Sequence, residues 1–224
     1  MDYVSLTLAI GFLVCFLLYD IIKNHKLNKI SKLMQNKQYD EVIETANKKL
    51  EQKLLSPYVC DLYILRALWN KKADAEFKNY LLECLDKPYS LTQRKDILDI
   101  YYYYFIFKGD KEWSSKLLEI IRETNDPGFI RYNEEAYEVM INKNTELLDD
   151  MIYGIENKKY SGLGLGIAVY MVGMQYLYLG DKENARIYIY NSLSCFHEKS
   201  FYAERARAEV DRLTEELGEE KLTY

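Results

Sequence analysis

Five short polar breaks recur along the chain at nearly constant spacing, and this recurrence restricts the possible folds more than any other feature. The central residues of successive breaks are separated by 34, 38, 34 and 37 positions. On each side of a break lies an apolar pattern long enough for about three or four helical turns. The repeated unit is therefore predicted to be helix, tight turn, helix. The breaks are residues 36–38, 70–72, 108–110, 142–144 and 179–181.

The prolines and the last segment support the same organisation. Pro57, Pro88 and Pro127 precede the first helices of units two, three and four, and proline suits the first turn of a helix. Residues 200–218 carry a single apolar stripe on an otherwise charged segment. This pattern predicts a helix that caps the array, with its apolar face packed and its charged face exposed to solvent. The stripe consists of Ala203, Ala206, Val210, Leu213 and Leu217.

The repeated units resemble the tetratricopeptide repeat (TPR), a family of helix–turn–helix units of about 34 residues. In the fifth unit, Gly173, Tyr176, Gly180 and Ala185 match the small, aromatic, turn and small positions of that family. The resemblance implies an all-α solenoid of about five αα-hairpins with a C-terminal capping helix. We expect a TPR-like domain over residues 23–218, followed by a short tail over 219–224.

In such a solenoid, the first helices line a concave groove. The groove positions that the resemblance implies are aromatic, apolar and slightly acidic, and they include no Lys or Arg. We therefore expect a protein or peptide partner with apolar anchors and some basic character, rather than an acidic C-terminal tail. The candidate partner-binding residues are Tyr58, Asp61, Leu65, Asp96, Asp99, Tyr103, Asn133, Tyr137, Tyr170 and Met174.

The N-terminal segment, residues 1–22, is predicted to be an uncleaved transmembrane anchor, with residues 3–22 as the membrane-spanning helix. Residues 3–22 carry no charge before Asp20, and a helix of this length spans roughly 30 Å. A buried core helix is the alternative. Lysines follow the segment at positions 23, 26, 29, 32 and 37 without an acid between residues 21 and 39. The positive-inside rule then places the N-terminus outside and the repeat domain in the cytoplasm, as a single-pass membrane protein.

The uncharged stretch SGLGLGIAVYMVGMQYLYLG, residues 161–180, has three interpretations. It contains five glycines and a glutamine, a poor composition for a membrane span. A helical pattern rather than a strand precedes it, which disfavours a phosphate-binding loop. We predict that it forms the first helix of unit five, and a second membrane span remains the main alternative.

Composition points away from catalysis and nucleic-acid binding. The net charge is −5, whereas a general nucleic-acid binder needs a basic face. The four cysteines are unclustered, and His25 and His197 lie in no catalytic or metal-binding motif. We expect no enzymatic activity, no cofactor, no metal and no small-molecule substrate.

The sequence thus predicts a membrane-anchored protein–protein interaction module that scaffolds or regulates a partner complex at the cytoplasmic face. Two alternatives remain open. The repeat domain could act as a chaperone or assembly factor on the extracytoplasmic side, or the chain could be a constitutive subunit of a membrane complex.

Overall fold

The computed structural model describes residues 3–219, apart from the side chains of residues 3–7 and Ala9. In this part of the chain the regular elements are twelve α-helices and one 3-10 helix, with no strand. The predicted all-α fold is therefore confirmed. The chain divides into two compact units, Met1–Ile97 and Leu98–Tyr224. Residues 220–224 of the predicted tail lie outside the described residues.

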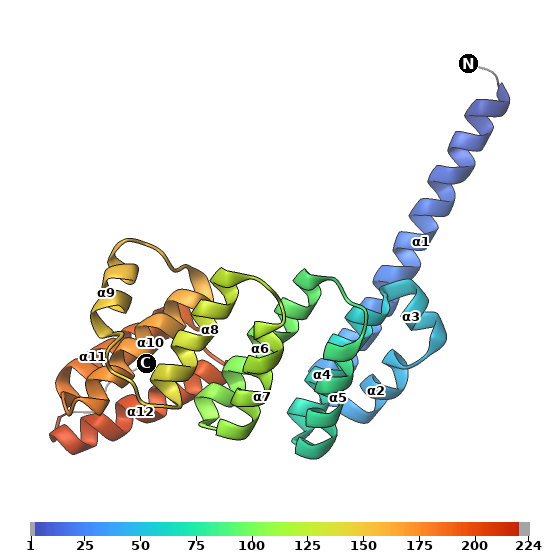
Figure 1. Cartoon of the computed structure of the whole chain (residues 1–224). Coiled ribbons are helices and arrows are strands. Elements are labelled where there is room, and N and C mark those ends of the chain that lie inside the picture. Colours follow the sequence, from blue (N-terminus) through green and yellow to red (C-terminus); the bar gives the residue numbers. More distant parts are fainter. Residues whose placement is uncertain (1–2, 220–224) are drawn as a thin grey trace. The chain divides into compact units, whose positions relative to one another are not determined.

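In the first unit, α4 lies at the centre and packs against α2, α3 and α5. Its buried side chains include Ile64, Leu65 and Leu68, and Phe77 and Leu81 of α5 are buried as well. The helices, shown from blue to green in Figure 1, are α1 (Tyr3–Gln35), α2 (Tyr39–Ala46), α3 (Lys49–Leu55), α4 (Pro57–Lys71), α5 (Asp74–Asp86) and the start of α6 (Leu91–Lys108).

In the second unit, α10 is the most enclosed helix and packs against α8, α9, α11 and η1. Residues 166–173 of α10 are all buried. A Cβ on Gly173 would lie 2.6 Å from Ile189 of α11, so only glycine permits this close approach of the two helices. The remaining elements are α7 (Lys111–Arg122), α8 (Pro127–Met140), α9 (Leu148–Glu156), α10 (Gly162–Tyr178), α11 (Lys182–Ser192), η1 (Leu193–Cys195) and α12 (Phe201–Leu217).

The prediction that the uncharged stretch 161–180 forms a packed helix is confirmed, because α10 occupies most of it. The predicted terminal helix is also confirmed. Ala203, Ala206, Val210 and Leu213 of α12 are buried, and Gly218 ends the helix with a left-handed backbone. The side chain of Ser200 caps its start by accepting the N–H of Ala203.

The predicted breaks are turns between helices, and a residue with a left-handed backbone lies in each one. In the second turn, the N–H of Lys72 donates to Trp69 O at 3.0 Å and the N–H of Ala73 donates to Leu68 O at 3.2 Å. An equivalent pair of bonds closes the first, third and fifth turns. This pattern satisfies carbonyls that the helix end would leave without a donor. The left-handed residues are Lys37, Lys72, Gly109, Lys143 and Gly180.

The structure differs from prediction in the first hairpin. The single second helix expected after the first turn is two short helices, because Lys48 adopts an extended backbone between α2 and α3. The first helix does not begin near residue 23, since α1 runs without a break from Tyr3 to Gln35.

The predicted transmembrane helix over residues 3–22 is not confirmed. A search of the described residues finds no helix that combines the length and the apolar character needed to cross a membrane. Part of the predicted segment, the side chains of residues 3–7 and Ala9, lies outside the described residues.

The left-handed turns generate a prediction about stability. Lys72 is exposed and has φ 61°, a conformation that costs a residue with a Cβ about 1 kcal/mol relative to glycine. Lys72→Gly should therefore raise the free energy of unfolding by up to about 1 kcal/mol. Gly109 has φ 69° and open space around it, so Gly109→Ala should lower this free energy by a similar amount. Urea unfolding of the full chain in mild detergent measures both changes. Midpoints of the two variants equal to that of the unaltered chain would contradict a conformational cost at these turns.

Candidate functional site

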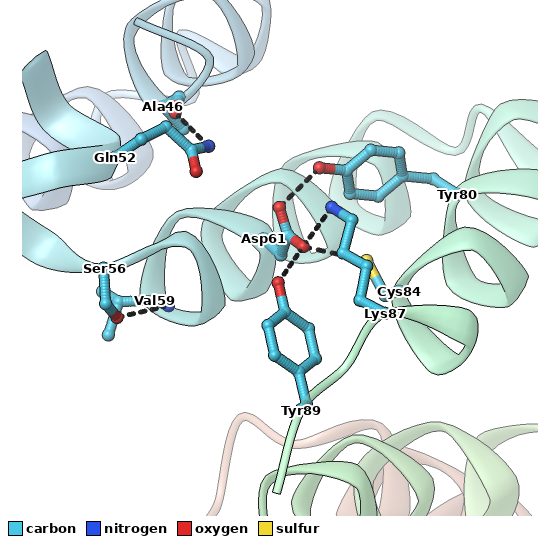
Figure 2. A network of polar contacts seen from close by, with 9 residues as sticks. All are labelled: Ala46, Gln52, Ser56, Val59, Asp61, Tyr80, Cys84, Lys87 and Tyr89. Carbon is cyan, nitrogen blue, oxygen red and sulfur yellow. Dashed lines mark hydrogen bonds and ion pairs between the residues drawn. The ribbon is translucent and has the colours of Figure 1, made fainter. Parts of the chain in front are cut away.

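Asp61 places a buried carboxylate at the centre of the first unit. Its side chain is 1% exposed. Tyr80 Oη donates a hydrogen bond to Asp61 Oδ1 at 2.8 Å, and Cys84 Sγ lies 3.6 Å from Oδ2. Lys87 Nζ and Tyr89 Oη both donate to Oδ2. Figure 2 shows these four side chains, from α5 and the linker after it, converging on the α4 carboxylate.

The environment of Asp61 keeps its uncharged neighbours protonated. Burial, together with the hydrogen bonds and the negative charge of Asp61, raises the pKa of Tyr80, Tyr89 and Cys84 far above their ordinary values. Burial and the same charge raise the pKa of the Cys60 thiol to about 11. Because the thiolate is the reactive form of cysteine, neither buried thiol is suited to nucleophilic chemistry. The cluster is built to hold a charge, with Lys87 as its cationic partner.

The network continues from Asp61 to the start of α6. The rings of Tyr58 and Tyr89 meet edge to face with centroids 5.4 Å apart. Tyr58 Oη donates to Asp96 Oδ2 at 3.1 Å, and burial together with the charge of Asp96 raises the pKa of Tyr58 to about 12. Tyr58, Asp61 and Asp96 were predicted as groove residues, but here they join α4, the linker and α6 to one another.

Half of the predicted groove residues are buried and serve packing instead. Tyr103 contacts Tyr102 and Tyr132, with ring centroids 5.4 and 5.9 Å apart. Tyr170 packs on Phe107, with centroids 4.6 Å apart. This burial corrects the expectation that these side chains line an open groove, because helical spacing does not reveal which faces the neighbouring helices cover. The buried members are Asp61, Leu65, Tyr103, Asn133 and Tyr170.

The other five predicted residues remain at least partly accessible. Tyr58, Tyr137 and Met174 are half-buried, whereas Asp96 and Asp99 are exposed. Tyr137 shares a hydrogen bond of 2.7 Å with Ser115 of α7. Tyr58 and Asp96 belong to the first unit, whereas Asp99, Tyr137 and Met174 belong to the second.

A run of exposed apolar side chains lies on α1 over residues 10–22. Phe12 is 77% exposed and Ile21 is 63% exposed, and the large apolar side chains between them are exposed as well. Because these positions are consecutive, they cover every face of the helix. In Figure 1 this part of α1 extends away from α2–α5 of the same unit. A helix that is apolar all round is typical of a core element or a membrane segment, and an exposed surface of this kind indicates an interaction site.

The base of the exposed segment is attached to α3. Tyr19 Oη donates to Leu54 O at 3.3 Å. Lys26 Nζ pairs with Glu51 Oε1 at 2.8 Å, and the Glu51 side chain is 4% exposed. Burial raises the pKa of Glu51, but the hydrogen bond from Lys26 and the positive charges of Lys26 and Lys48 outweigh it, so this pKa lies below its ordinary value. Glu51 is therefore a buried anion that fixes α3 against α1.

A cavity of about 500 Å³ opens beside η1 in the second unit. Tyr190, Leu193 and Phe196 provide apolar surface, and Glu198 and Arg207 also line it. Arg207 Nη1 donates to Glu198 O at 3.0 Å. The volume falls in the range of about 300–1,000 Å³ that is typical of ligand sites, and a few side chains of a peptide would fill it. Within residues 3–219, no group of three His, Cys, Asp or Glu side chains is placed to hold a metal ion.

Comparison with protein-family models, with curated proteins and with solved structures gives no match to this chain.

Sequence reasoning missed two of these features. The partners of Asp61 lie 19 to 28 residues away along the chain, and their order shows no motif. The signal was a lone carboxylate inside the apolar run PYVCDLYILRALW, which indicates a buried charge in need of donors. The cavity beside η1 had no sequence signal, because it arises where α11 ends and the chain turns toward α12.

The Asp61 network generates a prediction about the linker before α6. Tyr89→Phe removes one donor from a buried carboxylate and should lower the free energy of unfolding by about 2 kcal/mol. Lys71 also pairs with an aspartate, Asp40, but that aspartate is 77% exposed, so Lys71→Gln should leave stability nearly unchanged. Denaturant unfolding and hydrogen exchange of residues 87–97 measure both variants. Equal effects of the two substitutions would contradict a special role for the buried carboxylate.

Proposed function

We propose that the chain is a membrane-attached interaction module whose helical hairpins, resembling tetratricopeptide repeats, bind protein partners close to the membrane surface. The observation that carries the proposal is the exposed apolar half of α1, since Ile10–Ile22 present large apolar side chains on all faces. Leaving such a surface in water is costly, at about 25 cal/mol for each Å². Insertion into a bilayer removes this cost.

The charges beside this segment suit a membrane boundary. Tyr19 lies at the end of the apolar run, where an aromatic side chain favours the headgroup region. Lysines follow from Lys23 onward, and the positive-inside rule then assigns α2–α12 to the cytoplasmic side with the N-terminus outside. Protease treatment of intact cells tests this orientation, because cleavage of the helical body from outside would reverse it.

The rest of the chain suits partner binding. Tight turns and short helices repeat along both units, and repeated helical hairpins commonly present extended surfaces to proteins. In this proposal the cavity beside η1 accepts apolar side chains of a partner, and it replaces the buried positions of the expected groove. The proposed role is to scaffold or regulate a partner complex at the membrane.

Membrane attachment has a direct test. Leu13→Asp together with Phe16→Asp places two carboxylates inside the apolar segment. If the segment is inserted in a bilayer, each carboxylate raises the free energy of insertion by roughly 3 kcal/mol. We expect the full chain to float with neutral phosphatidylcholine vesicles after detergent removal and the double variant to remain in the dense fraction.

The matched control for this test is Leu179→Asp with Ile187→Asp, which adds the same charge at exposed apolar positions of the second unit. It should float like the unaltered chain. Failure of the unaltered chain to float would contradict membrane attachment and would favour the packing of α1 against a partner subunit.

Partner binding is tested by crosslinking in membranes. A photoreactive residue in place of Ser194, which lines the cavity, should form discrete protein adducts. Leu193→Asp places a charge against the apolar surface of the cavity and should reduce adduct yield about tenfold or more, since burying an unpaired charge costs several kcal/mol. Leu179→Asp, outside the cavity, should leave the yield unchanged. Equal yields in both variants would contradict this assignment of the binding surface.

A further inference from the structure

The helix α3 lies beside α1 at the level where the exposed apolar segment ends. Two contacts set this placement: Tyr19 with the carbonyl of Leu54, and Lys26 with Glu51. Tyr19 precedes Lys26 on α1, whereas Leu54 follows Glu51 on α3. The two helices therefore run antiparallel, and the C-terminal end of α3 points toward the apolar segment.

Lysines are concentrated around this junction. Residues 20–55 contain eight lysines and five acidic residues, although the whole chain has a net charge of −5. Two of these lysines are neutralised, because Lys26 pairs with Glu51 at 2.8 Å and Lys48 pairs with Glu44 at 3.0 Å. The positive charge that remains thus lies next to the exposed apolar segment of α1.

The other six lysines of residues 20–55 have no carboxylate within ion-pair distance among the described residues, and we call four of them, Lys23, Lys29, Lys49 and Lys53, the basic collar. Lys23 and Lys29 stand three residues before and after Lys26, so they flank the bridge to Glu51 on α1. Lys49 and Lys53 stand four residues apart on α3, so they share a face of that helix. Lys29, Lys49 and Lys53 are exposed, and Lys23 is half-buried.

The α3 face also carries an exposed apolar residue. Leu50 lies next to Lys49 in sequence and is 55% exposed. Two like charges four residues apart repel each other, and an anion between them would relieve that repulsion. Exposed lysines with a leucine among them are typical of helices that lie at the boundary between lipid headgroups and acyl chains.

We propose that the basic collar, Lys23, Lys29, Lys49 and Lys53, binds the headgroups of anionic phospholipids in the membrane that α1 enters. The inference rests on the proposed membrane attachment and adds a lipid preference to it. The occupant is a lipid surface because the collar adjoins the exposed apolar segment and has the opposite charge to these headgroups. Long lysine side chains reach such headgroups while their stems stay on the helix.

The test compares the full chain on two kinds of vesicle, neutral phosphatidylcholine and phosphatidylcholine with about 30% phosphatidylglycerol, whose surface attracts nearby lysines. The lipid concentration that floats half of the protein gives an apparent affinity for each vesicle. We expect tighter binding to the anionic vesicle than to the neutral one. This difference in apparent affinity should shrink in about 0.5 M salt, where charges are screened. Lys49→Gln with Lys53→Gln should reduce the anionic enhancement roughly 25-fold, at about fivefold per lysine.

Two control variants keep the result interpretable. Lys49→Arg with Lys53→Arg retains the charges and should keep the enhancement. Lys111→Gln with Lys199→Gln removes two exposed lysines of the second unit and should also keep it. An enhancement that survives Lys49→Gln with Lys53→Gln, or that falls equally in the second-unit control, would overturn the collar assignment. Absence of flotation on both vesicles would instead overturn the proposed membrane attachment.

Discussion

The left-handed backbone residue in each turn is the constraint on which the rest of the structure depends. After α1, α4 and α10 it reverses the chain within a few residues of the helix end, and the following helix packs against the one before it. Glycine adopts this conformation freely, yet three of the five turn positions are Lys37, Lys72 and Lys143. At Lys37 and Lys72 the packing of α2 on α1 and of α5 on α4 outweighs the local conformational cost. The spacing of these turns sets the helix lengths and thereby the residues available to the core of each unit.

Much of the fold was predictable because turns and helices leave local signals. The polar breaks, the helix-starting Pro57 and Pro127, and the charged α12 with its single apolar stripe each depend on residues close in sequence. The candidate site was less predictable because burial depends on residues far apart in sequence. Tyr103 and Tyr170 have the spacing of groove residues, but Tyr132 and Phe107 cover them. Helical periodicity identifies the faces of a helix without saying which neighbour each face meets.

Buried carboxylates stabilise two joints of the first unit in different ways. Asp61 gathers four donors from α5 and the following linker, and Glu51 receives Lys26 from α1. A buried charge tolerates few alternative arrangements, because losing a partner leaves its desolvation uncompensated. Such groups therefore favour one packing of the helices over others of similar apolar content. This selectivity matters in a fold built from short helices with similar apolar faces.

The continuity of α1 has a mechanical consequence. No loop separates the exposed apolar segment from the first turn, since a single helix of 33 residues includes both. From Lys23 to Gln35 this helix rises about 20 Å at 1.5 Å per residue. With its N-terminal half held in a bilayer, α1 would act as a rigid spacer rather than as a flexible tether. The first turn would then stand at a set height above the lipid, and partners would be selected by their reach as well as by their chemistry.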